Sequence, residues 1–233
     1  MNIAIIPARG GSKRLKKKNI RDFCGKPIIG YAIEKAINLG IFTDVIVTTD
    51  DPDIASISKD FGAHIPELRP SYLSDDYATT LDVMKYAVAN YIPEREVKTV
   101  VCCIYPTTPL LSPRFVLEGQ LLIESGQWDY VISATRYSHP IERAFTINNS
   151  GPAEVINPEH VLTRTQDLSD SFYDAGQFYW GERQTWITGK SVFLSKMTAV
   201  EIPKLQSIDI DTLEDWILAE HIYTANMNRA NGS

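Results

Sequence analysis

The sequence predicts an α/β protein with a doubly wound, mainly parallel sheet and a small inserted subdomain. Short runs of branched aliphatic residues alternate with longer segments in which apolar residues recur at helical spacing. This alternation is typical of parallel strands joined by right-handed helical crossovers, a fold that binds ligands at the carboxyl ends of its strands. The alternation stops after Thr135, and this break predicts the insertion.

The core strands are expected in short, nearly uninterrupted aliphatic runs, because a strand covered on both faces has no polar side. These runs are residues 2–6, 45–47, 99–104, 130–134, 177–180 and 207–211. The expected helices are residues 28–40, 52–62, 77–91, 113–126 and 212–227, with fraying from Asn226 onward. Asp50, Asp51 and Pro52 are typical of a helix start, and the acidic segment 74–76 is expected to begin the third helix. Gly40 is typical of a helix end.

Residues 136–170 are expected to form the insertion, between an α/β core of residues 1–135 and a return to that core over residues 171–233. Two apolar stretches, residues 145–147 and 155–156, flank a turn expected at residues 148–151, Asn-Asn-Ser-Gly. Apolar runs joined by turn-forming residues predict a β-hairpin.

The composition is that of an ordinary globular protein, with 44% hydrophobic and 22% charged residues in a chain of 233. No apolar run approaches the roughly 20 residues that span a bilayer, and the N-terminus lacks the pattern of a secretory signal. We therefore expect a cytoplasmic protein that contacts no membrane. The net charge of -6 argues against nucleic acid as a partner. The three cysteines, Cys24, Cys102 and Cys103, are expected to be reduced, with the adjacent pair on opposite faces of a strand.

A basic, glycine-containing segment directly follows the first expected strand. Around Gly10 and Gly11 it places six cations within ten residues: Arg9, Lys13, Arg14, Lys16, Lys17 and Lys18. The glycines let backbone N–H groups approach an anion closely, and the cations act on the same anion. Neither the P-loop pattern nor the dinucleotide-binding pattern fits residues 9–13. A solvated basic turn is the alternative, but the position at the edge of a parallel sheet favours a polyphosphate cradle.

A second pattern is the acidic pair Asp209 and Asp211. Residues two apart in a strand face the same way, so the two carboxylates would project together. Such a pair suits Mg²⁺, which prefers a few hard oxygen ligands and completes its shell with phosphate and water. The alternative for Asp211 is that it caps the last helix together with Thr212. A phosphate cradle and an acidic pair in one domain suggest metal-assisted phosphoryl or nucleotidyl chemistry.

A third pattern lies in residues 174–180. Gln177 and Tyr179 are expected to share one face of a strand, giving a polar surface suited to a sugar-like substrate, although an ordinary amphipathic sheet explains the pattern equally well. Arg143 and Arg164 of the insertion could receive a substrate carboxylate, or they could be ordinary surface arginines. The four histidines show no metal-ligand spacing.

Four ordered blocks of the chain closely resemble the CMP-sialic acid synthetases, also called acylneuraminate cytidylyltransferases. The blocks are Ile-Pro-Ala-Arg-Gly-Gly-Ser-Lys from residue 6, Leu-Arg-Pro from residue 68, Tyr-Pro-Thr-Thr-Pro-Leu from residue 105 and Ser-Ile-Asp-Ile-Asp-Thr from residue 207. The resemblance runs over nearly the whole chain. Residues 130–145 and 174–181 look most like the pseudaminic acid cytidylyltransferases, which supply CMP-pseudaminate for glycosylating bacterial surface proteins such as flagellin.

The resemblance implies a nucleotidyltransferase that moves CMP from CTP to the anomeric hydroxyl of a nine-carbon 2-keto sugar acid and releases pyrophosphate. The residues that it implies at the nucleotide are Ala8, Arg9, Gly10, Gly11, Ser12, Lys13, Lys18, Asn19, Arg69 and Thr80. Those implied at the sugar are Tyr105, Arg143, Arg164, Gln177, Tyr179 and Phe193. Asp209 and Asp211 would bind Mg²⁺ and, together with Arg9 and Lys18, support catalysis.

Family members are typically homodimers whose inserted segment reaches the partner's site, which would make residues 136–170 a dimerisation segment. The chain departs from many sialic acid members at Tyr105, where they carry Gln, and at residues 175–177, where they often carry Asn-Gly. These changes leave pseudaminic, N-acetylneuraminic and legionaminic acids open as acceptors. The alternatives from other classes are a non-catalytic nucleotide-binding regulatory protein and a hexose-1-phosphate nucleotidyltransferase.

Overall fold

The computed structural model describes residues 1–94, 98–147 and 151–231. Its helices and strands are, in chain order, β1 (Asn2–Pro7), β2 (Asp22–Phe23), β3 (Lys26–Pro27), α1 (Ile28–Asn38), β4 (Asp44–Thr48), α2 (Pro52–Asp60), α3 (Thr80–Tyr91), β5 (Val100–Ile104), α4 (Pro113–Glu124), β6 (Tyr130–Arg136), β7 (Phe145–Ile147), β8 (Ala153–Val155), β9 (Phe172–Glu182), α5 (Arg183–Thr188), β10 (Met197–Glu201) and α6 (Leu213–Asn231).

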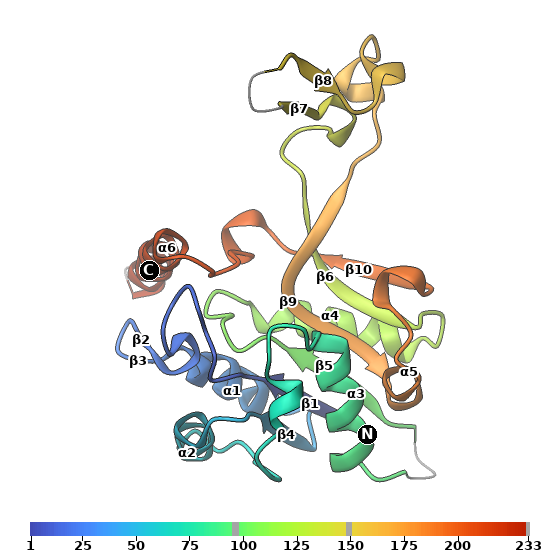
Figure 1. The fold of residues 1–233 in the computed structure, drawn as a ribbon. Helices are drawn as coiled ribbons and strands as arrows, with labels where there is room; N and C mark the ends of the chain where they lie inside the picture. Colours follow the sequence, from blue (N-terminus) through green and yellow to red (C-terminus); the bar gives the residue numbers. More distant parts are fainter. Residues whose placement is uncertain (95–97, 148–150, 232–233) are drawn as a thin grey trace.

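A six-stranded sheet forms the centre of the molecule, in the order β10-β6-β9-β5-β1-β4. β1 runs parallel to β4 and β5, and β6 runs parallel to β10, whereas β9 is antiparallel to both of its neighbours. The predicted α/β fold with a mainly parallel sheet is confirmed. β9 runs the opposite way because it carries the chain back from the insertion beside β6, which leads into it (Figure 1).

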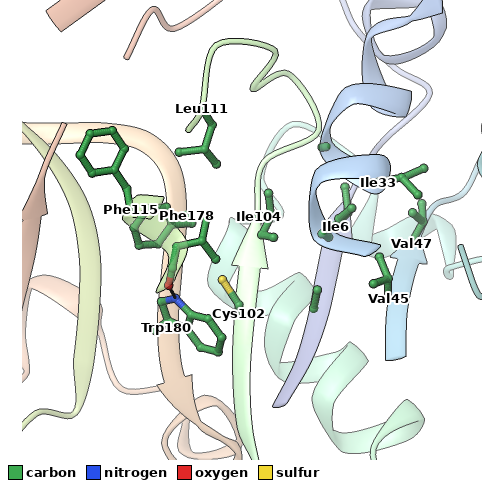
Figure 2. Packing of buried hydrophobic residues seen from close by; sticks show 14 of the residues in the cluster. Ile6, Ile33, Val45, Val47, Cys102, Ile104, Leu111, Phe115, Phe178 and Trp180 are labelled. Atoms are coloured by element: carbon green, nitrogen blue, oxygen red, sulfur yellow. Dashed lines mark hydrogen bonds between the residues drawn. The ribbon is translucent and has the colours of Figure 1, made fainter. Parts of the chain in front are cut away.

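Hydrophobic cores cover both faces of this sheet. Figure 2 shows one of them, where Ile33 of α1 meets Ile6 of β1 and where Phe178 and Trp180 of β9 lie beside α4. The opposite face packs against α3 and α5. Cys102 belongs to the first core and Cys103 to the second, as the alternation of a strand requires. Both cysteines are free, and burial raises the pKa of each thiol, so they act as packing residues.

A third, smaller core joins an early segment of the chain to a late one. Ile210 and Trp216 pack there against Leu15 and Phe23, and all four side chains are buried. The ring centroids of Phe23 and Trp216 are 5.4 Å apart in an edge-to-face arrangement, which adds to the apolar burial. This core fixes the segment before α6 against the basic segment that follows β1.

The insertion extends away from the sheet as an arm that ends in the β7–β8 hairpin (Figure 1). The predicted hairpin is therefore confirmed, with its second strand at residues 153–155 rather than 155–156. Every residue of β7 and β8 is exposed. Residues 148–150 of the turn predicted at 148–151 lie outside the described residues.

Residues 207–211 do not form the predicted strand. β10, which the sequence analysis missed together with β2, β3 and α5, occupies the sheet edge beside β6 instead. The chain then leaves the sheet, and Ile210 is buried in the third core rather than in a ladder. α6 continues through Asn231, beyond the helix end predicted at residue 227.

The third helix also begins later than predicted. α3 starts at Thr80, and its cap is Thr79, whose hydroxyl accepts the N–H of Asp82 while the Asp82 carboxylate accepts the N–H of Thr79. This reciprocal capping satisfies two N–H groups at the helix start. The acidic residues of segment 74–76 are thereby left for other contacts.

Within the described ranges, none of the helices combines the length and the apolar character that crossing a membrane would take.

Lys35 of α1 is the charged residue that the fold perturbs most clearly. Its ammonium group donates hydrogen bonds to the carbonyl oxygens of Thr108 (3.2 Å) and Pro109 (2.5 Å), which follow β5. Burial, with a smaller contribution from Lys26, lowers the pKa of Lys35 to about 7. Lys35 thus ties α1 to the loop after β5 through a charged form that burial disfavours.

Replacing Lys35 with Met should change how stability depends on pH. In the unfolded chain Lys35 keeps its proton up to about pH 10.5, whereas in the folded protein it loses it near pH 7. The free energy of unfolding of the wild type, relative to Lys35→Met, should therefore rise between about pH 7 and 10, by at most about 1.4 kcal/mol per pH unit. Urea unfolding at several pH values measures this difference.

The matched control is Lys59→Met, which removes an exposed lysine from α2. It should leave the pH profile parallel to that of the wild type. A wild-type minus Lys35→Met difference that stays constant across the range would contradict the assignment.

Candidate active site

A cleft of about 350 Å³ opens beside the carboxyl ends of β1 and β5. Residues from the segments 7–19, 69–80 and 105–107 line it, together with Asp211. The cleft thus lies at the carboxyl edge of the sheet, where a parallel sheet is expected to present its ligand site. Nine of the predicted site residues line the cleft: Arg9, Ser12, Lys13, Lys18, Asn19, Arg69, Thr80, Tyr105 and Asp211.

The backbone of the basic loop is held by the end of β4. The N–H of Ala8 donates to the carbonyl of Thr48 (3.0 Å), and the N–H of Gly10 donates to a carboxylate oxygen of Asp50 (3.0 Å). A Cβ atom on Gly10 would lie 2.6 Å from a carboxylate oxygen of Asp51, which caps α2. Gly10 is therefore required by close packing.

Two cations at the mouth of the cleft contact acids from the loop before α3. The Arg9 guanidinium donates to the carbonyl of Asp75 (2.9 Å) and lies 3.4 Å from the Asp76 carboxylate, which also pairs with the Lys13 ammonium. Lys13, and to a smaller extent Arg9, lowers the pKa of Asp76. These pairs are exposed, so an incoming polyanion can displace the carboxylate at little cost.

Two further cations contact Asp211. The Lys18 ammonium lies 3.2 Å from one carboxylate oxygen of Asp211 and donates to the carbonyl of Ile210 (2.7 Å). The Arg14 guanidinium lies 2.6 Å from the other carboxylate oxygen. The acidic and basic motifs of the sequence, 197 residues apart between Arg14 and Asp211, are therefore direct neighbours in space.

Asp211 does not cap α6. The Asp215 carboxylate accepts the N–H of Thr212 (2.8 Å), and the Thr212 hydroxyl accepts the N–H of Asp215 (3.2 Å). These two residues satisfy the helix start between them, so the capping alternative for Asp211 is wrong. Its carboxylate is left to face the cations of the cleft.

Asp209 lies two residues before Asp211 on the same extended segment and does not line the cleft. Burial of its carboxylate and the nearby charge of Asp211 raise the pKa of Asp209. A carboxylate whose ionisation is disfavoured by a neighbouring carboxylate gains from a cation that both can bind. Within the described part of the chain, no cluster of three or more acidic, histidine or cysteine side chains has a metal-site arrangement, so this pair is the metal-binding candidate.

Buried polar groups support the inner wall of the cleft. Asn19 is 4% exposed; its amide donates to the carbonyl of Arg9 (3.0 Å), and its own oxygen has no hydrogen-bond partner. Arg69 is 4% exposed, donates to the hydroxyl of Ser74 (3.1 Å) and lies 3.7 Å from Asp50. An unpartnered amide oxygen and a buried guanidinium are groups that a polar ligand can satisfy.

The opposite wall is a chain of hydroxyl groups. The hydroxyls of Tyr105 and Thr80 are 3.0 Å apart, the Tyr105 ring packs edge-on against Tyr179, and the Tyr179 hydroxyl donates to Asp174. Burial raises the pKa of Tyr105 to about 12, so its phenol stays protonated at neutral pH. Tyr179 is itself buried and lies behind Tyr105 rather than in the cleft lining.

Other predicted site residues lie away from the cleft lining. Gln177 is 2% exposed and donates to the carbonyl of Ala175. Arg143 and Arg164 lie on the arm, where Arg143 donates to the carbonyl of Thr163 and Arg164 pairs with Asp167. Phe193 lies on a short 3-10 turn (Val192–Leu194) and is 61% exposed. Within a single chain, these side chains therefore do not come together with the residues expected to bind the nucleotide.

Comparison with known proteins identifies the family. A family model described as cytidylyltransferase matches residues 3–150. The chain is 37% identical over 229 residues to a pseudaminic acid cytidylyltransferase of Campylobacter jejuni, which covers 98% of this chain and 99% of that relative. The chain belongs to the cytidylyltransferase family. It is also 31% identical to an N-acylneuraminate cytidylyltransferase of Streptococcus agalactiae, over 92% of this chain and 51% of the relative.

Solved structures share the fold of this cytidylyltransferase. A CMP:2-keto-3-deoxy-manno-octonic acid synthetase, solved in complex with CTP, aligns with a TM-score of 0.72 over 97% of this chain and 99% of its own, at 17% identity. A 4-diphosphocytidyl-2C-methyl-D-erythritol synthase from Anaerococcus prevotii aligns with a TM-score of 0.66 over 96% and 98%, at 15% identity. At these identities the likeness concerns the fold.

The sequence analysis missed three acidic residues that organise the site of this cytidylyltransferase. In the sequence, the positions of Asp50 and Asp76 indicate helix starts, and Asp174 begins a strand motif. Asp76 contacts Arg9 and Lys13, and Asp174 holds Tyr179. A signal was present for Asp76, because a separate Thr79-x-x-Asp82 pattern supplies the cap of α3.

Gly10→Ala should destabilise the protein, because the added methyl group would overlap the Asp51 carboxylate that caps α2. We expect a loss of about 1–3 kcal/mol in the free energy of unfolding, as for other overpacked sites, measured by chemical denaturation. Gly11→Ala is the matched control, since no atom lies within 4 Å of its Cβ position. Equal stability of the two variants would contradict this prediction, because it would show that the backbone around Gly10 can shift to accommodate a methyl group at no cost in stability.

Proposed function

We propose that this chain transfers CMP from CTP to the anomeric hydroxyl of a nine-carbon 2-keto sugar acid, with pseudaminic acid as the acceptor, and releases pyrophosphate. The observation that carries the proposal is the convergence of Arg9, Lys13 and Lys18 on the same cleft as Asp211. The relatives named above add the choice of cytidine and of acceptor. N-acetylneuraminic and legionaminic acids are the alternative acceptors.

The cationic loop would bind the triphosphate. The guanidinium of Arg9 and the ammonium groups of Lys13 and Lys18 reach the cleft. Each of these cations pairs there with a carboxylate, which shows that an anionic group fits beside it. Ser12, Thr80 and Asn19 offer hydroxyl and amide groups beside them. Gly11 would contribute its backbone N–H, whereas Ala8 and Gly10, whose N–H groups donate to Thr48 and Asp50, would contribute by holding the shape of the loop. Charged and neutral donors on one anion give both affinity and orientation.

Asp209 and Asp211 would hold a magnesium ion. Their oxygen donors and their mutual repulsion fit a hard divalent cation. When bound, the ion neutralises charge on the phosphate groups and on the leaving pyrophosphate.

The residues of the chain would then align the two substrates for the reaction. The acceptor hydroxyl attacks the α-phosphorus in line with the departing pyrophosphate and gives up its proton to water. The protein therefore needs to position the two substrates and stabilise charge rather than form a covalent intermediate. Arg9 and Lys18 would stabilise the charge that develops on the phosphate oxygens. Tyr105, held by Thr80 and backed by Tyr179, would form the wall on the sugar side.

The arm would complete the site of a second subunit. Apolar side chains on it are open to solvent, including Phe145 (57% exposed), Ile147 (71%) and Leu162 (96%), which is typical of a surface that another chain covers. In a homodimer, Arg143 and Arg164 would thereby come to the partner's cleft and receive the sugar carboxylate. Gln177 and Phe193 complete the proposed sugar-side set. We further propose a cytoplasmic location, where CTP is available.

The function is tested by pyrophosphate release from CTP and Mg²⁺ with each candidate sugar acid, using hexose 1-phosphates as the comparison acceptors. We expect turnover with pseudaminic acid above that with the other sugar acids, and none with the sugar phosphates. Asp209→Ala should lower turnover by a factor on the order of 10² or more, as for loss of a major electrostatic contribution.

Glu214→Ala is the matched control, because it removes an exposed acid from the start of α6. CTP binding without turnover on any acceptor would favour the regulatory-protein alternative. Turnover of Asp209→Ala near the wild-type rate at saturating Mg²⁺ would refute the metal assignment.

The dimer is tested by light scattering after size-exclusion chromatography. We expect the wild type to have twice the mass of one chain, and the double variant Phe145→Asp, Ile147→Asp to be a monomer, because buried carboxylates without partners oppose association. Leu121→Asp, on the exposed surface of α4, is the control and should remain dimeric. A monomeric wild type at micromolar concentration would contradict the proposal.

A further inference from the structure

The end of β4 contacts two separate parts of the cleft. The carbonyl of Thr48 accepts the N–H of Ala8 in the basic loop and also a guanidinium N–H of Arg69 (3.2 Å). The carbonyl of Thr49 accepts the backbone N–H of Arg69 (2.7 Å). These backbone contacts bring the loop and Arg69 to the same short segment, directly before Asp50.

The Asp50 carboxylate faces both groups. One of its oxygens accepts the N–H of Gly10 at 3.0 Å and lies 3.7 Å from a guanidinium nitrogen of Arg69. The Arg69 side chain is only 2% exposed, so its charge is largely removed from water. A buried guanidinium requires a nearby negative charge, and Asp50 is the carboxylate that provides it.

The negative charge of Asp50 also offsets the repulsion between two cations of the cleft. Burial lowers the pKa of Arg69, the charge of Asp50 opposes this effect, and the charge of Arg9 adds to it. Arg9 and Arg69 both line the cleft, and their like charges repel each other. A carboxylate placed behind them keeps both cations beside one cavity without filling that cavity, since Asp50 itself does not line it.

A purely local role does not explain Asp50. The helix cap of α2 is supplied by Asp51, whose side chain accepts the N–H groups of Asp53 (2.7 Å) and Ile54 (3.2 Å). Asp50 therefore keeps its carboxylate for the loop and for Arg69. Asp50 is 27% exposed in its side chain, so its contacts are screened only in part.

We propose that Asp50 is a positioning residue for CTP, which fixes the basic loop through the Gly10 backbone and holds the Arg69 guanidinium in register with it, so that the cations of the loop and Arg69 meet the triphosphate end of the nucleotide. The inference rests on the proposed function. Asp50 acts through these two groups and does not itself touch the ligand. Its removal should weaken nucleotide binding more than it changes the acceptor or the stability of the fold.

Two substitutions separate the two contacts. Asp50→Asn keeps an oxygen that can accept the Gly10 N–H but removes the charge, whereas Asp50→Ala removes both. We expect the Kd of CTP, measured by isothermal titration calorimetry, to rise about three- to tenfold for Asp50→Asn and more than about tenfold for Asp50→Ala, since hydrogen bonds to charged groups are the stronger ones. The KM for CTP should follow, with the KM for the sugar acid nearly unchanged.

The control variant is Asp60→Asn, which removes an equal charge from the exposed end of α2 and should bind CTP within about twofold of the wild type. A double-variant cycle supplies the readout that a structural role would not move. In an Arg69→Met background, Asp50→Asn should add less than about twofold to the Kd, because the group through which it acts is gone. Thermal unfolding and near-ultraviolet circular dichroism confirm that the variants are folded.

The inference is overturned if Asp50→Ala and Asp50→Asn bind CTP as the wild type does, or if the effect of Asp50→Asn is undiminished without Arg69. Either result leaves the proposed function standing, provided that the wild type binds CTP and turns it over. Absence of CTP binding by the wild type would instead refute the proposed function, and the inference with it.

Discussion

The structure around the cleft depends on how the positive charges of one loop are paired with carboxylates. Six cations within ten residues cannot lie on one short segment without carboxylates nearby, and the fold brings those carboxylates from distant parts of the chain. Asp76 meets Arg9 and Lys13, and Asp211 meets Arg14 and Lys18. Because most of these pairs are exposed, they contribute little to stability, and a polyanion with higher charge can replace them.

The third hydrophobic core makes this arrangement possible. Ile210 is buried against Leu15 and Trp216, so the carboxylate of the next residue is delivered to the loop by apolar packing rather than by charge attraction. Burial of such side chains is worth about 1.5–3 kcal/mol each, more than an exposed ion pair provides. The weak, exchangeable contacts of the cleft are thus held in place by strong contacts just behind it, and ligands can exchange without unfolding the loop.

The sheet and the arm are joined by two of the sheet's own strands. β6 and β9 form a long antiparallel pair whose far end carries the arm, and this pair explains why one strand of an otherwise parallel sheet runs the opposite way. Tyr179 and Asp174 lie on β9, so the residues that support the hydroxyl wall from behind and the base of the arm belong to one element. A partner subunit that contacts the arm would therefore adjoin the sugar side of the site rather than the phosphate side.

Local patterns in the sequence determined the α/β class, the bounds of most helices and strands, the inserted hairpin and the two charged motifs, because aliphatic periodicity and capping residues act over a few positions. They could not place β10, whose mixed composition resembles a loop, and they put a strand at residues 207–211, where alternation of Ile and Asp looks the same in any extended segment. Only the tertiary structure decided that Asp211 faces Lys18 instead of capping α6, and that Asp50 serves both Gly10 and Arg69. Those contacts join residues far apart in the chain, and packing of the cores, which no local pattern encodes, brings them together.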